Sequence, residues 1–103
     1  MRVYIASPLY SSGNVKDNLY QVMFTGEKLI QQGHIPYIAH FNHYWHDQFP
    51  HPESYWLELD FKWIDVCDCI LRLPGISKGA DLEVEYANKI GIPVYYSIDE
   101  LGR

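Results

Sequence analysis

One segment near the carboxyl end of the chain joins an apolar strand pattern, a loop of Pro, Gly and Ser residues, and acidic residues that open a helix. The strand pattern covers residues 69–73. In open α/β sheets, ligands bind beyond the carboxyl ends of the strands, where such loops lie. We expect Glu83 to lie in the opening turn of the helix, where the helix dipole keeps a carboxylate ionised. An ionised carboxylate is suited to nucleophilic attack, so Glu83 is the first candidate for a catalytic residue.

A second group of candidates is a run of histidines and aromatic residues. His40, His43 and His46 recur every three residues, and three imidazoles with one water form a common catalytic zinc site. This spacing alone does not make three side chains converge in an irregular loop, so we favour a lid over a metal site. In that lid Tyr44 or Trp45 would stack on a ligand, and His43 would make a hydrogen bond to it. Burial of these rings against a second subunit is the alternative.

The elements that must position these residues alternate between strand and helix. Strand-like stretches cover residues 3–6, 35–39, 69–73 and 92–96. Helices are expected from the N-cap Asn14 to about Gln32 and from Pro52 to about Val66. A last helix is expected to follow the Gly, Pro and Ser loop and to end at Gly91. Strands separated by helices pair in parallel with right-handed crossovers. The predicted fold is an α/β three-layer sandwich around a small parallel, Rossmann-like (flavodoxin-like) sheet of four to five strands.

Each predicted helix has an apolar stripe, which we expect to pack on the sheet. The stripes are Leu19, Val22, Met23, Gly26, Leu29 and Ile30 in the first helix, Trp56, Leu59, Trp63 and Val66 in the second, and Leu82, Tyr86 and Ile90 in the third. Residues 40–51 show no such pattern and are expected to form a long irregular loop, which in a compact domain is usually functional.

Length and composition restrict the possible functions. The chain of 103 residues suits a single domain, 1–103, with one core. Its formal charge of −5 argues against binding to nucleic acid polymers, which requires a basic face. No stretch is apolar for long enough to cross a bilayer, so no membrane partner is expected. Cys67 and Cys69 lie too close together for a usual redox or zinc pair, so we expect buried thiols in a reducing cytoplasm.

Three segments taken together resemble the nucleoside 2-deoxyribosyltransferase superfamily, and most closely its small, largely uncharacterised bacterial and phage branch. They are residues 4–8 in the first strand, 67–68 at the entry to the third, and 77–83 before and within the last helix. In that family a Glu early in the last major helix attacks the anomeric carbon of a 2-deoxyribosyl group, and Glu83 is at the matching position. The resemblance implies that Glu83 expels the base and forms a glycosyl-enzyme ester, which another base or water then resolves.

The resemblance also implies roles for other residues. Asp68 would contact and protonate the leaving base, because the family uses Asp residues near the third strand for this purpose. The residues that would bind substrate are Tyr4, Ser7, Tyr10, Ser11, His43, Trp45, Ser77 and Gly79. The family needs no cofactor and no metal. Its members assemble as dimers or larger, so a homodimer or higher homo-oligomer is expected.

Two reactions and two rival functions remain open at this stage. Transferases of the family carry an acidic residue six positions before the nucleophile, where this chain has Ser77. Together with Ser11, Lys78 and Gly79, Ser77 would suit a 5′-phosphate, as in nucleotide-preferring hydrolases of the superfamily. We therefore expect cleavage of the N-glycosidic bond of a 2′-deoxynucleoside or its 5′-monophosphate, with transfer to another base or to water. The rivals are a non-catalytic nucleotide-binding or sensor domain of the same fold and a metal-dependent hydrolase that uses the histidines.

Overall fold

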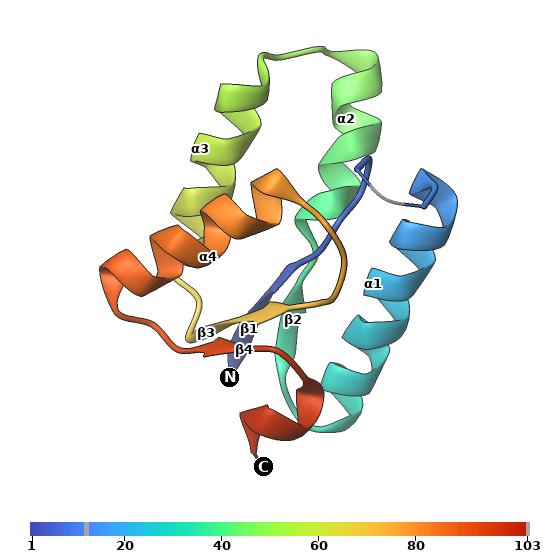
Figure 1. Ribbon diagram of the computed structural model, residues 1–103. Coiled ribbons are helices and arrows are strands. Elements are labelled where there is room, and N and C mark those ends of the chain that lie inside the picture. Colours follow the sequence, from blue (N-terminus) through green and yellow to red (C-terminus); the bar gives the residue numbers. More distant parts are fainter. Residues whose placement is uncertain (12, 103) are drawn as a thin grey trace.

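The computed structural model describes residues 1–11 and 13–102, which form a parallel sheet with helices on both faces (Figure 1). The elements are β1 (Arg2–Ala6), α1 (Val15–Gln31), β2 (Ile35–Tyr37), η1 (Ala39–Phe41), α2 (Asn42–Gln48), α3 (Glu53–Ile64), β3 (Cys69–Arg72), α4 (Lys78–Ile90), β4 (Val94–Tyr95) and η2 (Ile98–Leu101), where η marks a 3-10 helix. In the described residues the sheet has four strands in the order β2-β1-β3-β4, paired in parallel. The predicted α/β fold with a small parallel sheet is confirmed.

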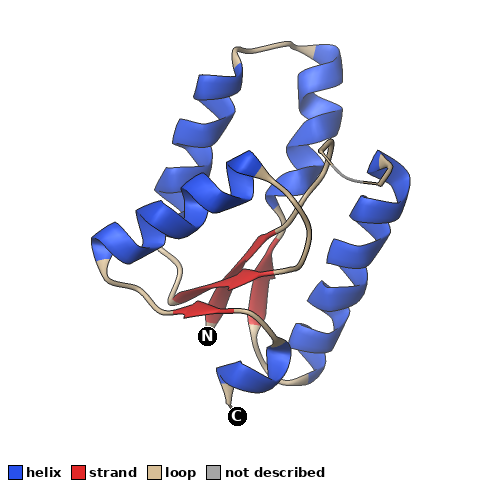
Figure 2. Cartoon of the chain, viewed as in Figure 1, coloured by secondary structure: helices blue, strands red, loops and turns tan. Residues whose placement is uncertain are grey.

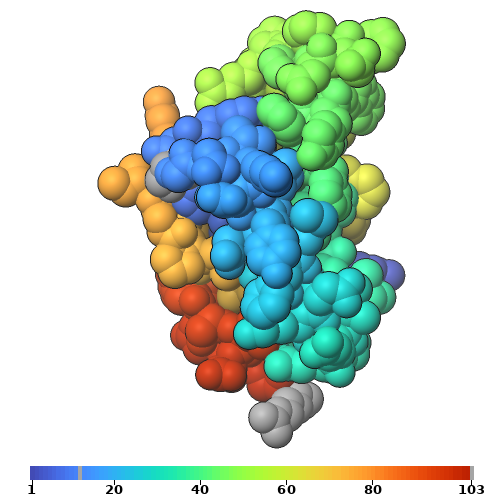
Figure 3. All heavy atoms as spheres, turned by 90° about the vertical axis from the view of Figure 1, so that its right-hand side faces the viewer, coloured from blue at the N-terminus to red at the C-terminus, as the bar shows by residue number. Residues whose placement is uncertain are grey.

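The two faces of the sheet pack against different helices, as Figure 2 shows, because successive side chains of a strand point in opposite directions. We call them the α1 face and the α3/α4 face. The cluster on the α1 face consists of Val3, Ile5, Val22, Leu29, Cys69, Leu71 and Leu101. The cluster on the α3/α4 face consists of Tyr4, Ala6, Ile64, Cys67, Ile70, Ala80 and Ala87. Figure 3 shows α1 on the outer surface of the molecule, between α2 and η2.

Local signals begin and end the helices, and Asn14 and Gly91 have the positions that were predicted for them. The side chain of Asn14 accepts a hydrogen bond from the backbone N–H of Asp17 at 2.9 Å and caps α1. Ser77 caps α4 in the same way and accepts from Ala80 at 3.1 Å. Gly91 ends α4 at a φ of +83°, a conformation that favours glycine. Since α1 follows β1 and α4 follows β3, both caps lie at the carboxyl edge of the sheet.

Residues 40–51 differ from the prediction of an irregular loop, which is wrong. They contain part of η1 and the whole of α2. The helix α2 has no buried residue, so it shows no apolar stripe from which a sequence pattern could identify it. Pro52 is the N-cap of α3 and not its first helical residue. The histidine-rich segment is therefore a short helix that stands beside α3.

The apolar stripe predicted for α1 is partly correct. In α3 the side of the helix that faces the sheet differs from the predicted one. Leu19, Val22, Gly26 and Leu29 are buried in α1 as expected, but Met23 and Ile30 are exposed. In α3 the buried residue is Ile64, whereas Trp63 and Val66, which were expected to pack on the sheet, are exposed. The inward face of α3 consequently includes Asp60 and Ile64, which are four residues apart and share one side of the helix.

The helix α4 also turns a different face to the sheet from the one predicted. Its buried residues are Ala80, Glu83 and Ala87, whereas Ile90 is exposed. Alanine side chains let a helix approach a sheet closely, so the larger apolar residues of α4 lie at the margins of the contact. This rotation brings Glu83 to the interior.

Other expectations concern the cysteines and the membrane. Cys67 and Cys69 are buried free thiols, as predicted, and they belong to the clusters on opposite faces of the sheet. Among the described residues, no helix has both the length and the apolar character needed to cross a membrane.

Candidate active site

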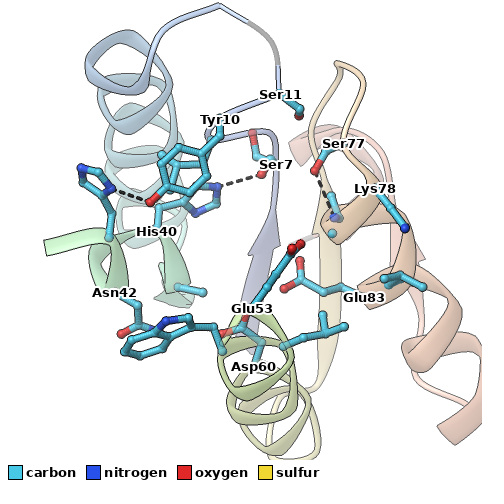
Figure 4. A pocket seen from close by; sticks show the side chains of 18 of the residues that line it. Ser7, Tyr10, Ser11, His40, Asn42, Glu53, Asp60, Ser77, Lys78 and Glu83 are labelled. Carbon is cyan, nitrogen blue, oxygen red and sulfur yellow. Dashed lines mark hydrogen bonds between the residues drawn. The ribbon is translucent and has the colours of Figure 1, made fainter. Parts of the chain in front are cut away.

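A cavity of about 730 Å³ lies at the carboxyl edge of the sheet, in the range of small-molecule binding sites. Its walls come from the loop that follows β1, from η1 and α2, from the inward side of α3, and from the start of α4. Figure 4 shows Asp60 and Glu83 entering this cavity from α3 and α4. The position agrees with the rule that ligands of open α/β sheets bind beyond the carboxyl ends of the strands.

The structure brings most of the predicted site residues together in this cavity. Those that line it are Tyr4, Ser7, Tyr10, Ser11, His43, Ser77, Gly79 and Glu83. Asp68 and Trp45 are not among the lining residues. The residues that sequence analysis did not single out include Asp60 and Trp56, which both face the cavity from α3.

Asp68 lies at the amino edge of the sheet, opposite the cavity. The prediction that it contacts the base is therefore wrong. The residue precedes β3, so it is at the amino end of that strand. Its carboxylate accepts a hydrogen bond from the backbone N–H of Arg2 at 2.6 Å. Because Arg2 begins β1, this bond ties together the amino ends of two neighbouring parallel strands. Asp68 thus has a structural contact far along the sheet from Glu83.

The predicted stacking by Tyr44 or Trp45 is corrected as well. Both side chains are exposed, Trp45 by 50%. The neighbouring His43 and His46 do line the cavity. In a helix, adjacent residues point in different directions, so α2 turns its histidines inward and these two rings outward. The indole that reaches the cavity is Trp56.

Glu83, Tyr4 and Asp60 form a buried cluster at the base of the cavity. Glu83 is only 8% exposed, and the hydroxyl of Tyr4 donates a hydrogen bond to its carboxylate at 2.6 Å. Asp60 lies close enough to the same carboxyl group for each acid to affect the pKa of the other. The three residues come from β1, α3 and α4, so only the folded chain brings them together.

Burial determines the protonation of this cluster. Burial raises the pKa of Glu83 well above its ordinary value, and the charge of Asp60 adds to this, while the hydrogen bond from Tyr4 and the charge of Arg72 oppose it. Burial also raises the pKa of Asp60 to about 6, against the effect of its hydrogen bonds to Glu83 and Tyr4. The side-chain interaction between the two carboxyls raises the pKa of Glu83 and lowers that of Asp60, so protonation of the pair is favoured at Glu83.

The predicted ionisation of Glu83 by the helix dipole is wrong. The acidic residue in the first turn of α4 is Asp81, and Glu83 lies further into the helix. The dipole stabilises a charge by about 0.3–1 kcal/mol and acts mainly within the first turn. Full burial can shift a carboxyl pKa by about 3–5 units, at roughly 1.4 kcal/mol per unit. Burial is therefore the larger effect at Glu83.

Asp60 is the functional candidate that sequence analysis missed. The pattern of α3 gives a signal for it, since Trp56, Asp60 and Ile64 follow one another at four-residue intervals on the buried side of the helix. An acid between two apolar residues of one helical face is buried unless the helix turns away, and a buried carboxyl usually has a partner or a function. The apolar stripe predicted for this helix was chosen from hydrophobicity alone and so did not include Asp60.

Three hydrogen bonds hold the rim of the cavity. The hydroxyl of Tyr10 is hydrogen-bonded to Nδ1 of His43 at 2.5 Å, and Ser11 donates to the carbonyl of Ile76 at 2.6 Å. Nε2 of His40 donates to the carbonyl of Ser7 at 2.9 Å, and burial lowers the pKa of this imidazole, so it is neutral. The loop after β1 is thus fixed to α2 on one side and to the loop before α4 on the other.

The histidines of this region have separate partners. His40 faces Ser7, His43 faces Tyr10, and His46 accepts from Trp56. In the described part of the chain there is no group of three or more His, Cys, Asp or Glu side chains that could hold a metal ion.

Charge in the cavity is mainly negative. Its described lining contains the carboxyls of Asp47, Glu53, Asp60 and Glu83, and Lys78 as its only Lys or Arg. The nearby guanidinium of Arg72 does not face the cavity, because it donates to the carbonyls of Leu73 and Gly75 and pairs with Asp81 at 3.0 Å.

The fold has a counterpart among the solved structures of enzymes. The structure is similar to that of a 2-deoxyribosyltransferase from the psychrotolerant bacterium Bacillus psychrosaccharolyticus, which is characterised as a biocatalyst for the synthesis of antiviral and antitumoral nucleosides. The TM-score is 0.67 at 21% sequence identity, over 91% of this chain and 69% of that one. The likeness shows that the two proteins share a fold.

The family of the chain follows from its sequence. A family model matches residues 1–97, and the chain belongs to that family, a domain of unknown function designated DUF7768. No curated protein matches the chain significantly.

Proposed function

We propose that the protein cleaves the N-glycosidic bond of a 2′-deoxynucleoside or its 5′-monophosphate, through a glycosyl ester on Glu83, and transfers the sugar to another base or to water. The observation that carries the proposal is the buried cluster of Tyr4, Glu83 and Asp60 at the base of the cavity. Burying two adjacent carboxyls destabilises a fold, so a structural role alone does not explain them. Carboxyl pairs with displaced pKa values are typical of glycosidic-bond chemistry.

The first step requires Glu83 as the anion and Asp60 as the acid. When substrate binds, Asp60 takes the one proton of the neighbouring carboxyl pair and Glu83 becomes the anion. A carboxylate oxygen of Glu83 then bonds to C1′ of the sugar, and the bond from C1′ to the base nitrogen breaks. Its electron pair goes to the base, which takes the proton from Asp60. The products are a glycosyl ester on Glu83, a neutral free base and an ionised Asp60.

The second step reverses the first with a new nucleophile. An acceptor base or a water molecule attacks C1′, and the C1′–oxygen bond to Glu83 breaks. The proton of the acceptor goes to Asp60, so the carboxyl pair again holds one proton and the cycle closes. Tyr4 donates its hydrogen bond to Glu83 and stabilises the carboxylate both before attack and on its departure.

Charge in the cavity favours the nucleoside over its monophosphate. A 5′-phosphate adds about two negative charges to a cavity in which carboxylates outnumber the single lysine. Ser11 already donates its proton to the carbonyl of Ile76, so it has none left for a phosphate oxygen. One of the groups expected to bind a phosphate is thus already used as a donor within the protein.

The test is a chromatographic assay. Purified protein is incubated with deoxynucleosides and their 5′-monophosphates, with and without a foreign free base, and products are separated by reversed-phase chromatography. A new nucleoside that requires the acceptor indicates transfer, and free base without acceptor indicates hydrolysis. Absence of both across the panel would refute the proposal and favour the non-catalytic binding domain. Glu85→Gln, an exposed acid on the same helix, is the matched control for Glu83→Gln.

A further inference from the structure

Trp56 is the aromatic side chain of α3 that lines the cavity, and its orientation is held from several sides. Its indole Nε1–H donates a hydrogen bond to Nδ1 of His46 at 2.8 Å. Rings that meet it nearly edge-on are those of Trp45, His46, His51 and Tyr55, at centroid distances of 5.3 to 5.8 Å and interplanar angles of 71° to 88°. The polar edge of the indole is therefore satisfied within the protein.

His46 joins α2 to the start of α3 through this contact. Its Nδ1 also accepts from the backbone N–H of His51 at 3.3 Å. Because two donors point at Nδ1, that nitrogen carries no proton and serves as an acceptor. The histidine-rich segment thus fixes an indole at the cavity wall.

Trp56 and Asp60 lie on the same side of α3, four residues apart, which is about 6 Å along the helix axis. A planar ligand placed against the indole would have its edge close to the Asp60 carboxyl. Glu53, one turn earlier, also lines the cavity. The inward side of α3 therefore presents an aromatic surface between two carboxyl groups.

We propose that Trp56 stacks on the nucleobase of the substrate and that His46 is the residue that positions it. The identity of the ligand rests on the proposed function, whereas the stacking role rests on the geometry of Trp56. Stacking would hold the leaving base with its edge at Asp60, the group that protonates it. Trp56 would therefore select ligands that have a planar aromatic ring, and the sugar alone would not bind to it.

Fluorescence tests the stacking directly. The chain has three Trp residues, so Trp45→Phe and Trp63→Phe together leave Trp56 as the single reporter. Glu83→Gln is added to prevent turnover. Titration with deoxyadenosine, deoxyguanosine, deoxycytidine and thymidine is expected to quench the emission, and 2-deoxyribose is expected to leave it unchanged. No quenching by any nucleoside, or equal quenching by 2-deoxyribose, would overturn the proposal.

Substitutions measure the contribution of the ring. In the Glu83→Gln background, Trp56→Leu is expected to weaken nucleoside binding roughly 5- to 150-fold, the usual effect of losing one base-stacking ring. Trp56→Phe keeps an aromatic ring, so its affinity for nucleosides is expected to lie between that of the protein with Trp56 and that of Trp56→Leu. If Trp56→Leu does not fold, Trp56→Phe tests the stacking in its place. Trp63→Phe is the matched control on the same helix, since Trp63 stacks on Tyr37 at 4.9 Å and does not line the cavity. Binding that is unchanged in both Trp56 variants would overturn the proposal.

The positioning role of His46 has its own readout. His46→Asn offers an amide oxygen near the place of Nδ1 and is expected to retain nucleoside binding, whereas His46→Leu is expected to lose it. Equal effects of the two substitutions would contradict a hydrogen-bonding role. The outcomes also separate the two proposals. Binding that depends on Trp56 without any base release in the wild type would refute the proposed function alone. A rate of base release that is unchanged by substitution of Trp56 would refute only the stacking proposal.

Discussion

The two faces of the sheet are built from the same strands but differ in the side chains that they bury. On the α1 face the cluster is wholly apolar, with Val3 and Ile5 of β1 packed against residues of α1. On the α3/α4 face the same strand contributes Tyr4, whose hydroxyl meets the buried carboxyl of Glu83. Burial of one apolar side chain contributes about 1.5–3 kcal/mol to folding, whereas a buried carboxyl opposes it. The comparison indicates that the α1 face stabilises the fold, whereas the α3/α4 face includes the buried carboxyls of the proposed site.

The strongest test of this difference is Glu83→Gln, which should remove activity and leave the fold intact. Without the nucleophile, base release is expected to fall by about 10⁴-fold or more. The amide has nearly the same shape and carries no charge, so the unfolding free energy at pH 7 should stay the same or rise. Chromatographic rates and urea denaturation on the same preparations measure both quantities. Wild-type rates in this variant would exclude Glu83 as the nucleophile.

The opposite result is expected from a large-to-small change on the α1 face. Leu29 is fully buried against the sheet, so Leu29→Ala should lower the unfolding free energy by about 2–5 kcal/mol. Its activity per folded molecule should remain that of the wild type at a temperature well below unfolding. Urea denaturation and the base-release assay together check this outcome. A loss of activity in the fully folded variant would show that the two faces are not independent.

The cost of the buried acids should be visible in the dependence of stability on pH. Burial raises the pKa of Asp60 from 3.8 to about 6, so between these pH values the folded state binds more protons than the unfolded state. The unfolding free energy of the wild type is therefore expected to fall as pH rises from about 4 to about 6. Asp60→Asn should remove the part of this loss that comes from Asp60, while the raised pKa of Glu83 maintains its own part. The variant should be more stable than the wild type at pH 7 by about 1–3 kcal/mol.

The same variant should be impaired in catalysis. Loss of the acid that protonates the base is expected to slow base release by about 10²- to 10⁴-fold. Denaturation at a series of pH values, with activity measured at pH 7, separates the two effects. A wild-type pH dependence of stability in Asp60→Asn would mean that the carboxyl is not buried in the way described.

The smallest effect is expected at Asp68, on the far edge of the sheet. Asp68→Asn keeps an oxygen that can accept the hydrogen bond from Arg2, and surface substitutions usually change stability by less than about 0.5 kcal/mol. Neither base release nor its pH profile should change. A tenfold loss of activity would restore the role in base protonation that the sequence suggested.

Features that depend on neighbours along the chain could be predicted from the sequence. Asn14 is a typical N-cap residue and Gly91 suits the left-handed end of a helix, and both are where the pattern indicated. Ser77 is also a typical N-cap residue, although it was predicted only as a substrate-binding residue. The alternation of strands and helices also predicts the parallel sheet and places the cavity at its carboxyl edge. The helix α2 could not be predicted in this way, since it buries no residue and so shows no apolar periodicity.

The tertiary structure alone decided which side chains meet. Glu83 could be singled out from its place after β3, but Asp60 becomes its partner only because α3 and α4 pack side by side with rotated faces. The same packing brings Trp56, and not Trp45, to the cavity. The direction of β3 places Asp68 at the amino edge of the sheet, away from the cavity. The physical reason is that caps and periodicity are set by residues a few positions apart. The rotation of a helix about its axis, and with it the burial and pKa of an acid, is set by contacts between distant parts of the chain.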